Sequence, residues 1–228
     1  MPDERDKRLA AHAALALLPD SGVIGLGTGS TVRYFIEAIA ERVRAGYQYE
    51  GVPTSHKSRE LAASLGVPLL HDDGPWDVLL CVDGADEVSD ELDLIKGGGG
   101  AHTREKIVNF AARKNAIVVD ESKLSRALGE RFAVPVEVLP FAHRETHFLL
   151  SLHGEPTLRL VPSTGEPFRT DSGNYVYDLR TGIIRRPAEL DADLRTIPGV
   201  VETGLFCGRV DVLFVTRDGE VQRIDKPA

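Results

Sequence analysis

The chain has few of the residues that build metal and redox sites. Its 228 residues include two cysteines, one methionine and one tryptophan. Cys81 and Cys207 stand in apolar, strand-like runs outside any C-x-x-C pair, so they favour buried free thiols over a zinc or redox motif. His143 and His147 are four residues apart but have no third ligand in the pattern. We therefore expect no metal site.

Positive charge and long apolar runs are also scarce. Lys and Arg number 27 against 35 Asp and Glu, a net charge of −8, which disfavours a broad nucleic-acid surface. No apolar run approaches the roughly 18 residues of a membrane-spanning helix. The charged start M-P-D-E-R-D-K-R leads into an alanine-rich helix, expected over 3–18, rather than a secretory apolar segment. We expect a cytoplasmic protein with no nucleic-acid and no membrane partner.

The first half of the chain alternates two kinds of segment. Strand-like runs at 22–26, 77–82 and 116–119 alternate with helical patterns at 31–45 and 103–114. The strands are almost continuously apolar, as in parallel sheets covered on both faces. The pattern predicts a Rossmann-like α/β fold with a mostly parallel sheet.

The pattern changes after about residue 128. The runs 158–161 and 175–179 flank T-D-S-G-N and predict a hairpin, and 188–195 predicts a short helix. The last run, 210–224, predicts a hairpin that rejoins the large sheet. We therefore expect a large α/β domain of residues 1–129 and 204–228, with a smaller α+β domain inserted at 130–203.

The segment G-L-G-T-G-S-T at 25–31 follows a strand and opens a helix. Free backbone N–H groups and the positive end of the helix dipole gather at such a point and suit a phosphate, with Ser30 or Thr31 as N-cap. A tight strand–helix turn is the simpler alternative. The dinucleotide fingerprint fails at Ser30 and no Walker A lysine follows, so the pattern indicates one small phosphate monoester.

Acidic groups, a lysine and four glycines are concentrated between residues 83 and 106. Asp83 ends a buried strand, where open α/β sheets bind ligands, and Asp86 follows three residues later. Such a pair suits sugar hydroxyls or proton transfer, although Asp-Gly is also a common turn. Glu87 is expected to face solvent or a cation. Lys96 and the bare backbone of 97–100 suit a developing negative charge.

Several further residues are ambiguous by themselves. Glu105 follows Thr103, the expected N-cap, and its place in a first helical turn favours a role with the helix dipole. Lys7 and Lys123 in isolation indicate surface cations. Ser55 either caps a helix or contacts a ligand.

Taken together, the motifs resemble the A-type ribose-5-phosphate isomerase family, over essentially the whole chain. The order and spacing of eight segments carry the resemblance: G-L-G-T-G-S-T (25–31), P-T-S-x-x-S (53–58), V-D-G-A-D-E (82–87), I-K-G-G-G (95–99), T-R-E-K-I (103–107), P-V-E-V (135–138), T-D-S-G-N (170–174) and I-P-G-V-V-E-T-G-L-F (197–206).

The resemblance implies an aldose–ketose isomerase that interconverts D-ribose 5-phosphate and D-ribulose 5-phosphate in the non-oxidative pentose phosphate pathway. It implies Glu105 as base, Asp83 and Asp86 as sugar-binding acids that could exchange the proton-shuttle role, and Lys96 with its glycines as the enediolate-stabilising segment. The substrate-binding positions that it implies are Thr28, Gly29, Ser30, Thr31, Asp83, Gly84, Ala85, Asp86, Lys96, Gly97, Gly98, Gly99, Lys123 and Lys7. No cofactor is implied.

The resemblance also implies a homodimer or homotetramer, with the small domain as an oligomerisation or lid unit. His102 departs from the family pattern, where an apolar residue is common, and Gly100 stands where alanine is frequent. Two other functions stay open: a non-catalytic sugar-phosphate sensor, and an acyl or CoA transferase with Glu105 as nucleophile.

Overall fold

The computed structural model describes residues 4–226, so the first residue of the expected 3–18 helix lies outside the described part. The chain divides into two compact units. Unit 1 takes the described residues of Met1–Ala85, Arg104–Lys123 and Arg209–Ala228, and unit 2 takes Asp86–Thr103 and Leu124–Gly208. Each unit is described by itself.

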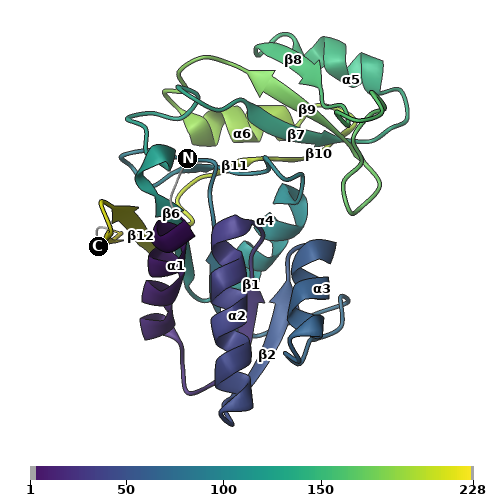
Figure 1. Ribbon diagram of the computed structural model, residues 1–228. Helices are drawn as coiled ribbons and strands as arrows, with labels where there is room; N and C mark the ends of the chain where they lie inside the picture. Colours follow the sequence, from purple (N-terminus) through teal and green to yellow (C-terminus); the bar gives the residue numbers. More distant parts are fainter. Residues whose placement is uncertain (1–3, 227–228) are drawn as a thin grey trace. The chain divides into compact units, whose positions relative to one another are not determined.

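Unit 1 is built on a six-stranded sheet with the order β13-β12-β6-β3-β1-β2 (Figure 1). All neighbouring strands are parallel except the β12–β13 hairpin, which confirms the expected fold class and the return of the C-terminal hairpin to the large sheet. The strands are β1 (Ser21–Leu26), β2 (Gln48–Pro53), β3 (Val78–Asp83), β6 (Asn115–Asp120), β12 (Val212–Arg217) and β13 (Glu220–Asp225).

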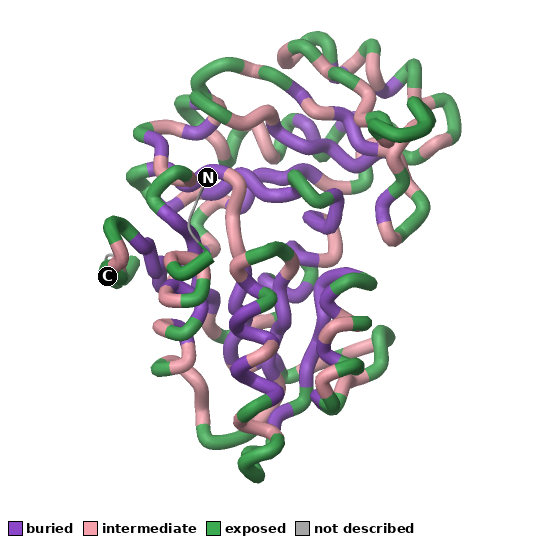
Figure 2. The backbone as a smooth tube through the Cα atoms, viewed as in Figure 1, coloured by how far each residue is buried: buried purple, intermediate pink, exposed green. Residues whose placement is uncertain are grey.

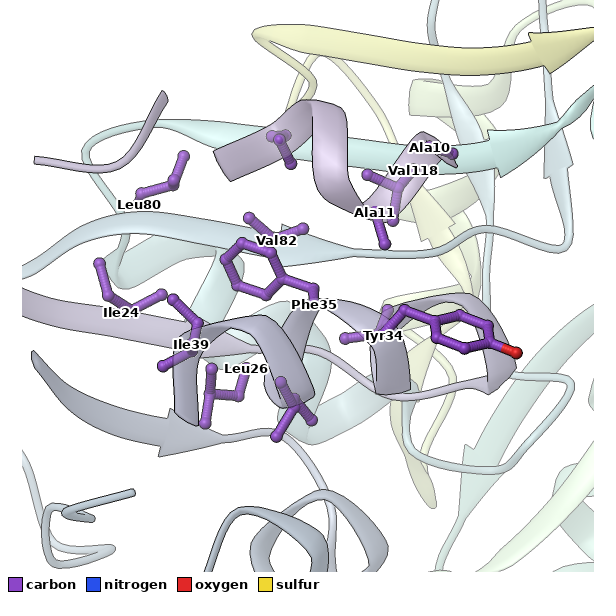
Figure 3. Close-up of a cluster of buried hydrophobic side chains, with 14 of the residues drawn as sticks. Ala10, Ala11, Ile24, Leu26, Tyr34, Phe35, Ile39, Leu80, Val82 and Val118 are labelled. Atoms are coloured by element: carbon purple, nitrogen blue, oxygen red, sulfur yellow. The ribbon is translucent and has the colours of Figure 1, made fainter. Parts of the chain in front are cut away.

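Helices cover both faces of this sheet. On one face α1 (Glu4–Ala13) and α2 (Ser30–Arg44) pack over Ile24, Val82 and Val118, with Phe35 fully buried among them (Figure 3). On the other face Val108 of α4 (His102–Ala111) packs with Cys81. The central strands are buried along nearly their whole length (Figure 2), as their apolar runs require.

Three shorter elements complete unit 1. The 3₁₀ helix η1 (Ala14–Leu17) follows α1, α3 (His56–Ser64) packs beside β2, and the 3₁₀ helix η2 (Glu121–Lys123) follows β6. The expected Thr31 start of α2 is one residue late. Its N-cap is Gly29, with φ 128° and no side chain, so the prediction of Ser30 or Thr31 as cap is wrong.

Unit 2 contains two antiparallel sheets with α5 (His143–Leu150) and α6 (Pro187–Arg195). The first sheet has the order β10-β7-β9-β8 and the second β11-β5-β4. Their strands are β4 (Glu87–Val88), β5 (Leu94–Ile95), β7 (Val134–Val138), β8 (Glu155–Leu158), β9 (Tyr175–Arg180), β10 (Val200–Thr203) and β11 (Leu205–Phe206).

Two parts of the prediction differ from the structure. Residues 86–103, expected in the large domain, belong to unit 2, because β5 pairs with β11 and β4 pairs with β5, and unit 2 also takes 124–129 and 204–208. The hairpin partner of β9 is β8, which begins three residues earlier than the expected 158–161 run and shares only Leu158 with it. The apolar Leu160 that suggested the later strand is 49% exposed and forms only an isolated bridge with Pro167.

Candidate functional site

The turn between β1 and α2 lies against Asp83, at the end of β3. The amide of Gly27 donates to the Val82 carbonyl at 3.0 Å. A Cβ at Gly27 would collide with the Asp83 carboxylate and would lie 2.6 Å from the Asp83 Cα. Gly27 is therefore glycine because the backbone passes directly over Asp83.

Asp83, the last residue of β3, is 3% exposed and holds the β1–α2 turn. Its Oδ1 accepts hydrogen bonds from the amides of Thr28 at 3.0 Å and Gly84 at 2.8 Å. These bonds orient a carboxylate that is almost removed from water, as a buried acid requires. The structure thus brings together Thr28, Asp83 and Gly84, three of the residues that the sequence singles out.

A cluster of hydroxyl groups fixes the other side of the turn. Thr28 Oγ1 lies 2.8 Å from Thr54 Oγ1 and Ser55 Oγ and 3.2 Å from Ser58 Oγ. Ser58 Oγ donates to the Gly27 carbonyl at 2.6 Å, and Ser55 caps α3 by accepting from the Ser58 amide. The Thr28 side chain therefore holds the shape of the loop from within the protein. The P-T-S-x-x-S motif supplies this cluster, which sequence reasoning did not foresee.

The first turn of α2 carries the groups that suit an anion. Gly29 has no side chain to cap the helix, and the first turn contains no acidic residue. Helix geometry leaves the first N–H groups without an intrahelical acceptor, and the dipole places positive charge there. Ser30 is exposed and Thr31 is half-buried. This end of α2 has the properties of a phosphate site.

Glu105 lies in the first turn of α4 but is only 4% exposed. A carboxylate that merely complements a helix dipole can remain in water, whereas burial costs free energy. Dipole complementation alone therefore does not account for Glu105. The neighbouring Lys106 and Asn109 are buried as well, at 6% and 3% exposed.

In unit 2, β11 and the residue before it support Lys96. Lys96 is 3% exposed, and its amide donates to the Gly204 carbonyl at 2.8 Å. Its Nζ lies 5.6 Å from the ring centroid of Phe206, within the range of a cation–π contact. A Cβ at Gly204 would collide with the Lys96 carbonyl oxygen and would lie 2.8 Å from Pro135 Cδ. Two residues of the I-P-G-V-V-E-T-G-L-F motif, Gly204 and Phe206, therefore hold the backbone and the side chain of Lys96.

Asp86 is bound to the glycine loop. Its Oδ2 accepts from the Gly98 amide at 2.7 Å, and its own amide donates to the Ile95 carbonyl at 2.9 Å. Gly97 has φ 105° and Gly100 has φ 75°, a region that favours glycine. Unit 2 thus brings together Asp86, Lys96 and the Gly97–Gly99 backbone, another group of the singled-out residues.

A buried carboxylate holds the start of α4. Glu137, 1% exposed, accepts from Thr103 Oγ1 at 2.5 Å, Thr170 Oγ1 at 2.9 Å and Asn174 Nδ2 at 2.8 Å. Since α4 begins at His102, Thr103 lies inside the helix, and its expected role as N-cap is wrong. Its hydroxyl instead joins the helix to the P-V-E-V and T-D-S-G-N segments.

Glu87 corrects another expectation. Rather than facing solvent or a cation, it is fully buried and accepts hydrogen bonds from the amides of Gly129, Arg131 and Phe132. A carboxylate in a sequence looks like a surface group, and only the distant loop that donates to it explains its burial.

The two outlying lysines lie on different elements of unit 1. Lys7, on α1, pairs with Glu4 Oε1 at 2.8 Å. The pKa of Glu4 lies below its usual value, foremost because of the hydrogen bond from Lys7 and then that from Tyr34. Lys123 ends η2, just after β6. Ala85 is the last residue of the first segment of unit 1, and Asp86 is the first residue of unit 2.

Across residues 4–226 no helix is long and apolar enough to cross a membrane. In the same part of the chain, no three His, Cys, Asp or Glu side chains gather as a metal site would require.

Comparison with known proteins assigns the chain to a family. The family described as Ribose 5-phosphate isomerase A (phosphoriboisomerase A) matches residues 50–220. Ribose-5-phosphate isomerase A of Chloroflexus aurantiacus is 47% identical over 223 residues, which cover 97% of this chain and 93% of that protein.

Solved structures agree with this match. Ribose 5-phosphate isomerase A from Methanocaldococcus jannaschii has a TM-score of 0.92 at 42% identity, covering 98% of this chain and 99% of that one. A D-ribose-5-phosphate isomerase in complex with phospho-erythronic acid has a TM-score of 0.94 at 37% identity, covering 99% and 100%.

The mostly parallel sheet, covered by helices on both faces, and the strand–helix turn suited to an anion define an α/β protein of the phosphate-binding class. The comparisons with known proteins identify the family within that class. The chain belongs to the ribose 5-phosphate isomerase A family.

Proposed function

We propose that the chain interconverts D-ribose 5-phosphate and D-ribulose 5-phosphate in the non-oxidative pentose phosphate pathway. The full-length match to the isomerase family carries this conclusion. The burial of Glu105 supports it, since an enzyme of this kind needs one carboxylate base held away from bulk water.

The reaction moves two protons within the open-chain sugar. We assign to Glu105 the removal of the proton from C2 of the aldose and its delivery to C1. The proton of the C2 hydroxyl must reach the oxygen on C1, and we assign this transfer to Asp83 or Asp86. The product then has its carbonyl at C2 and a hydroxymethyl group at C1, so atoms and charge balance.

The intermediate enediolate carries negative charge on oxygen. Lys96 supplies an ammonium group, and the Gly97–Gly99 segment supplies amides; such groups lower the barrier when they are fixed before the reaction. Gly84 and Ala85 follow Asp83 in the same sugar-binding segment. No step in this scheme needs a metal or an organic cofactor.

The phosphate serves as a handle whose binding energy orients the reacting carbons. We assign it to the residues from Thr28 to Thr31 at the start of α2, with Lys7 and Lys123 as further contacts. The support is the uncapped first turn of α2, where free amides and the dipole suit an anion.

We also propose a cytoplasmic homodimer or homotetramer that binds neither nucleic acid nor membranes. The supporting observation for assembly is a set of exposed apolar side chains in unit 2, the unit that we assign to oligomerisation: Phe141 at 87%, Phe148 at 64% and Leu152 at 72% exposed.

The direct test is to incubate the purified chain with D-ribose 5-phosphate and to measure D-ribulose 5-phosphate over time. We expect steady turnover in both directions, and little with D-ribose, which lacks the phosphate. Phospho-erythronic acid should inhibit competitively. Absence of ketose would contradict the proposal and favour the sensor, whereas a Glu105 adduct trapped by hydroxylamine would favour acyl transfer.

A further inference from the structure

Arg159, which no sequence motif singles out, is bonded to the glycine loop. It follows β8, and its side chain is 14% exposed. Its Nη1 donates to the Gly97 carbonyl at 2.8 Å and to the Gly98 carbonyl at 3.1 Å. One guanidinium nitrogen therefore holds two successive carbonyl groups of the loop.

The guanidinium group is itself fixed by two neighbours. Asp178 on β9 accepts from Nε at 3.0 Å and also from Nη2, a two-point ion pair that sets the plane of the group. Arg159 Cζ lies 5.7 Å from the centroid of the Phe168 ring. A Cβ at Gly100 would lie 2.6 Å from Phe168 Cζ, so the same ring borders the loop.

Because the peptide unit is planar, the bonds from Arg159 to the two carbonyl groups also fix the orientation of the amides that follow them. In a trans peptide the N–H points opposite to the C=O of the preceding residue. With the Gly97 carbonyl on Arg159, the Gly98 amide must point away from it, and this amide donates to Asp86 Oδ2 at 2.7 Å. The Gly98 carbonyl fixes the Gly99 amide in the same way.

The loop needs such a restraint because glycine backbones populate many conformations. A flexible loop would present its amides to a developing charge only part of the time, whereas preorganised donors are the ones that accelerate a reaction. Four of the five N–H donors of Arg159 are already used by protein acceptors. Most of the donor capacity of Arg159 is thus used within the protein, and one N–H group remains.

We propose that Arg159 is a positioning residue that fixes the glycine loop in the conformation which holds the Gly98 amide on Asp86 and presents the Gly99 amide. The proposal rests on the isomerase function proposed above, in which this loop stabilises the enediolate. Asp178 acts one step further out, by orienting Arg159.

The test compares Arg159→Met with the parent enzyme. We expect kcat for D-ribose 5-phosphate to fall about 10- to 100-fold, as for a misplacement of about 1 Å, while KM changes less than about threefold. Arg113→Met is the matched control, because Arg113 forms a similar two-point pair with Asp77 on the surface of unit 1 and should leave kcat unchanged.

Two readouts separate positioning from a general loss of structure. Methylguanidinium added to Arg159→Ala should restore part of kcat, and Arg159→Lys should lie between Met and the parent. Asp178→Asn should lower kcat less than Arg159→Met, and the double variant should be no worse than Arg159→Met, because both act through one contact. These variants keep the test valid even if Arg159→Met folds poorly.

A third readout does not depend on catalysis. Amide hydrogen exchange at Gly98 should rise at least about tenfold in Arg159→Met, because the restraint on the loop is lost. Unchanged exchange together with kcat within twofold of the parent would overturn the role of Arg159. A parent chain that makes no ketose would instead overturn the isomerase function, whatever the exchange at Gly98 shows.

Discussion

At the residue scale, two acidic side chains in the first turns of two helices differ in burial. Glu105 and Glu145 each stand in the first turn of a helix, α4 and α5. Glu145 is exposed, whereas Glu105 is 4% exposed. The helix dipole favours a carboxylate in either first turn, so burial is the property that sets Glu105 apart and supports the role proposed for it.

Glu105→Gln should keep substrate affinity and lower kcat by about 10²–10⁴-fold, because the amide preserves size but cannot accept the proton. Steady-state kinetics and the affinity for phospho-erythronic acid measure the two effects separately. Glu145→Gln removes the exposed first-turn carboxylate and should behave as the parent. A Glu105→Gln rate within tenfold of the parent would remove Glu105 as the base.

Thr103 offers a second test at this scale. Thr103→Val keeps the shape of the side chain but loses the hydrogen bond to Glu137, which holds the first turn of α4 two residues before Glu105. We expect kcat to fall roughly tenfold, the worth of one oriented hydrogen bond of about 1.4 kcal/mol. Thr103→Ser should retain most of the rate, and equal rates for Val and Ser would contradict this role.

At the element scale, the β1–α2 turn depends on one close approach. Gly27→Ala would drive a Cβ against both the carboxylate and the Cα of Asp83. Overpacking of about 1–3 kcal/mol should lower Tm by roughly 2–10 °C and reduce kcat/KM, because the phosphate turn and Asp83 move together.

The double variant Gly27→Ala/Asp83→Ala separates the two collisions. Because the Asp83 Cα remains 2.6 Å from the new Cβ, removal of the carboxylate should recover little of the lost stability. A Tm for Gly27→Ala equal to that of the parent would show that the turn does not need glycine at this position.

The elements of unit 1 could be predicted from the sequence because their signals are local. Residues 78–82 of β3 and 116–119 of β6 are apolar throughout, and the β12–β13 hairpin turns at a D-G pair. The strand β8 was missed because E-P-T-L is polar and partly exposed, while the next run, which includes Leu160, is more apolar but stays outside the sheet.

The charged residues that support the site could not be predicted in the same way. Glu87, Glu137 and Arg159 look like surface groups along the chain, and their partners lie 19 to 62 residues away in sequence. Only the packed fold brings a buried charge to the donors or acceptors that compensate it. The motifs singled out Glu105 and Lys96 and also include Glu137 and Gly204, but they do not show which residues these two contact.

At the scale of the whole molecule, exposed apolar side chains on unit 2 predict assembly. Phe148→Asp on α5 should shift the chain toward monomer in size-exclusion chromatography with light scattering, since a charge in an apolar interface is costly. Val221→Asp, at a 36% exposed valine of β13 in unit 1, is the matched control and should not change the mass. A parent that is already monomeric would contradict the proposed assembly.

In the proposed mechanism, a buried carboxylate moves a proton between adjacent carbons of a sugar phosphate. The most direct measurement is NMR of D-ribose 5-phosphate incubated with the chain in D₂O. We predict deuterium at C2 of the recovered aldose together with formation of D-ribulose 5-phosphate, and neither above background with Glu105→Gln. Absence of both deuterium exchange and ketose with the parent chain would contradict this mechanism.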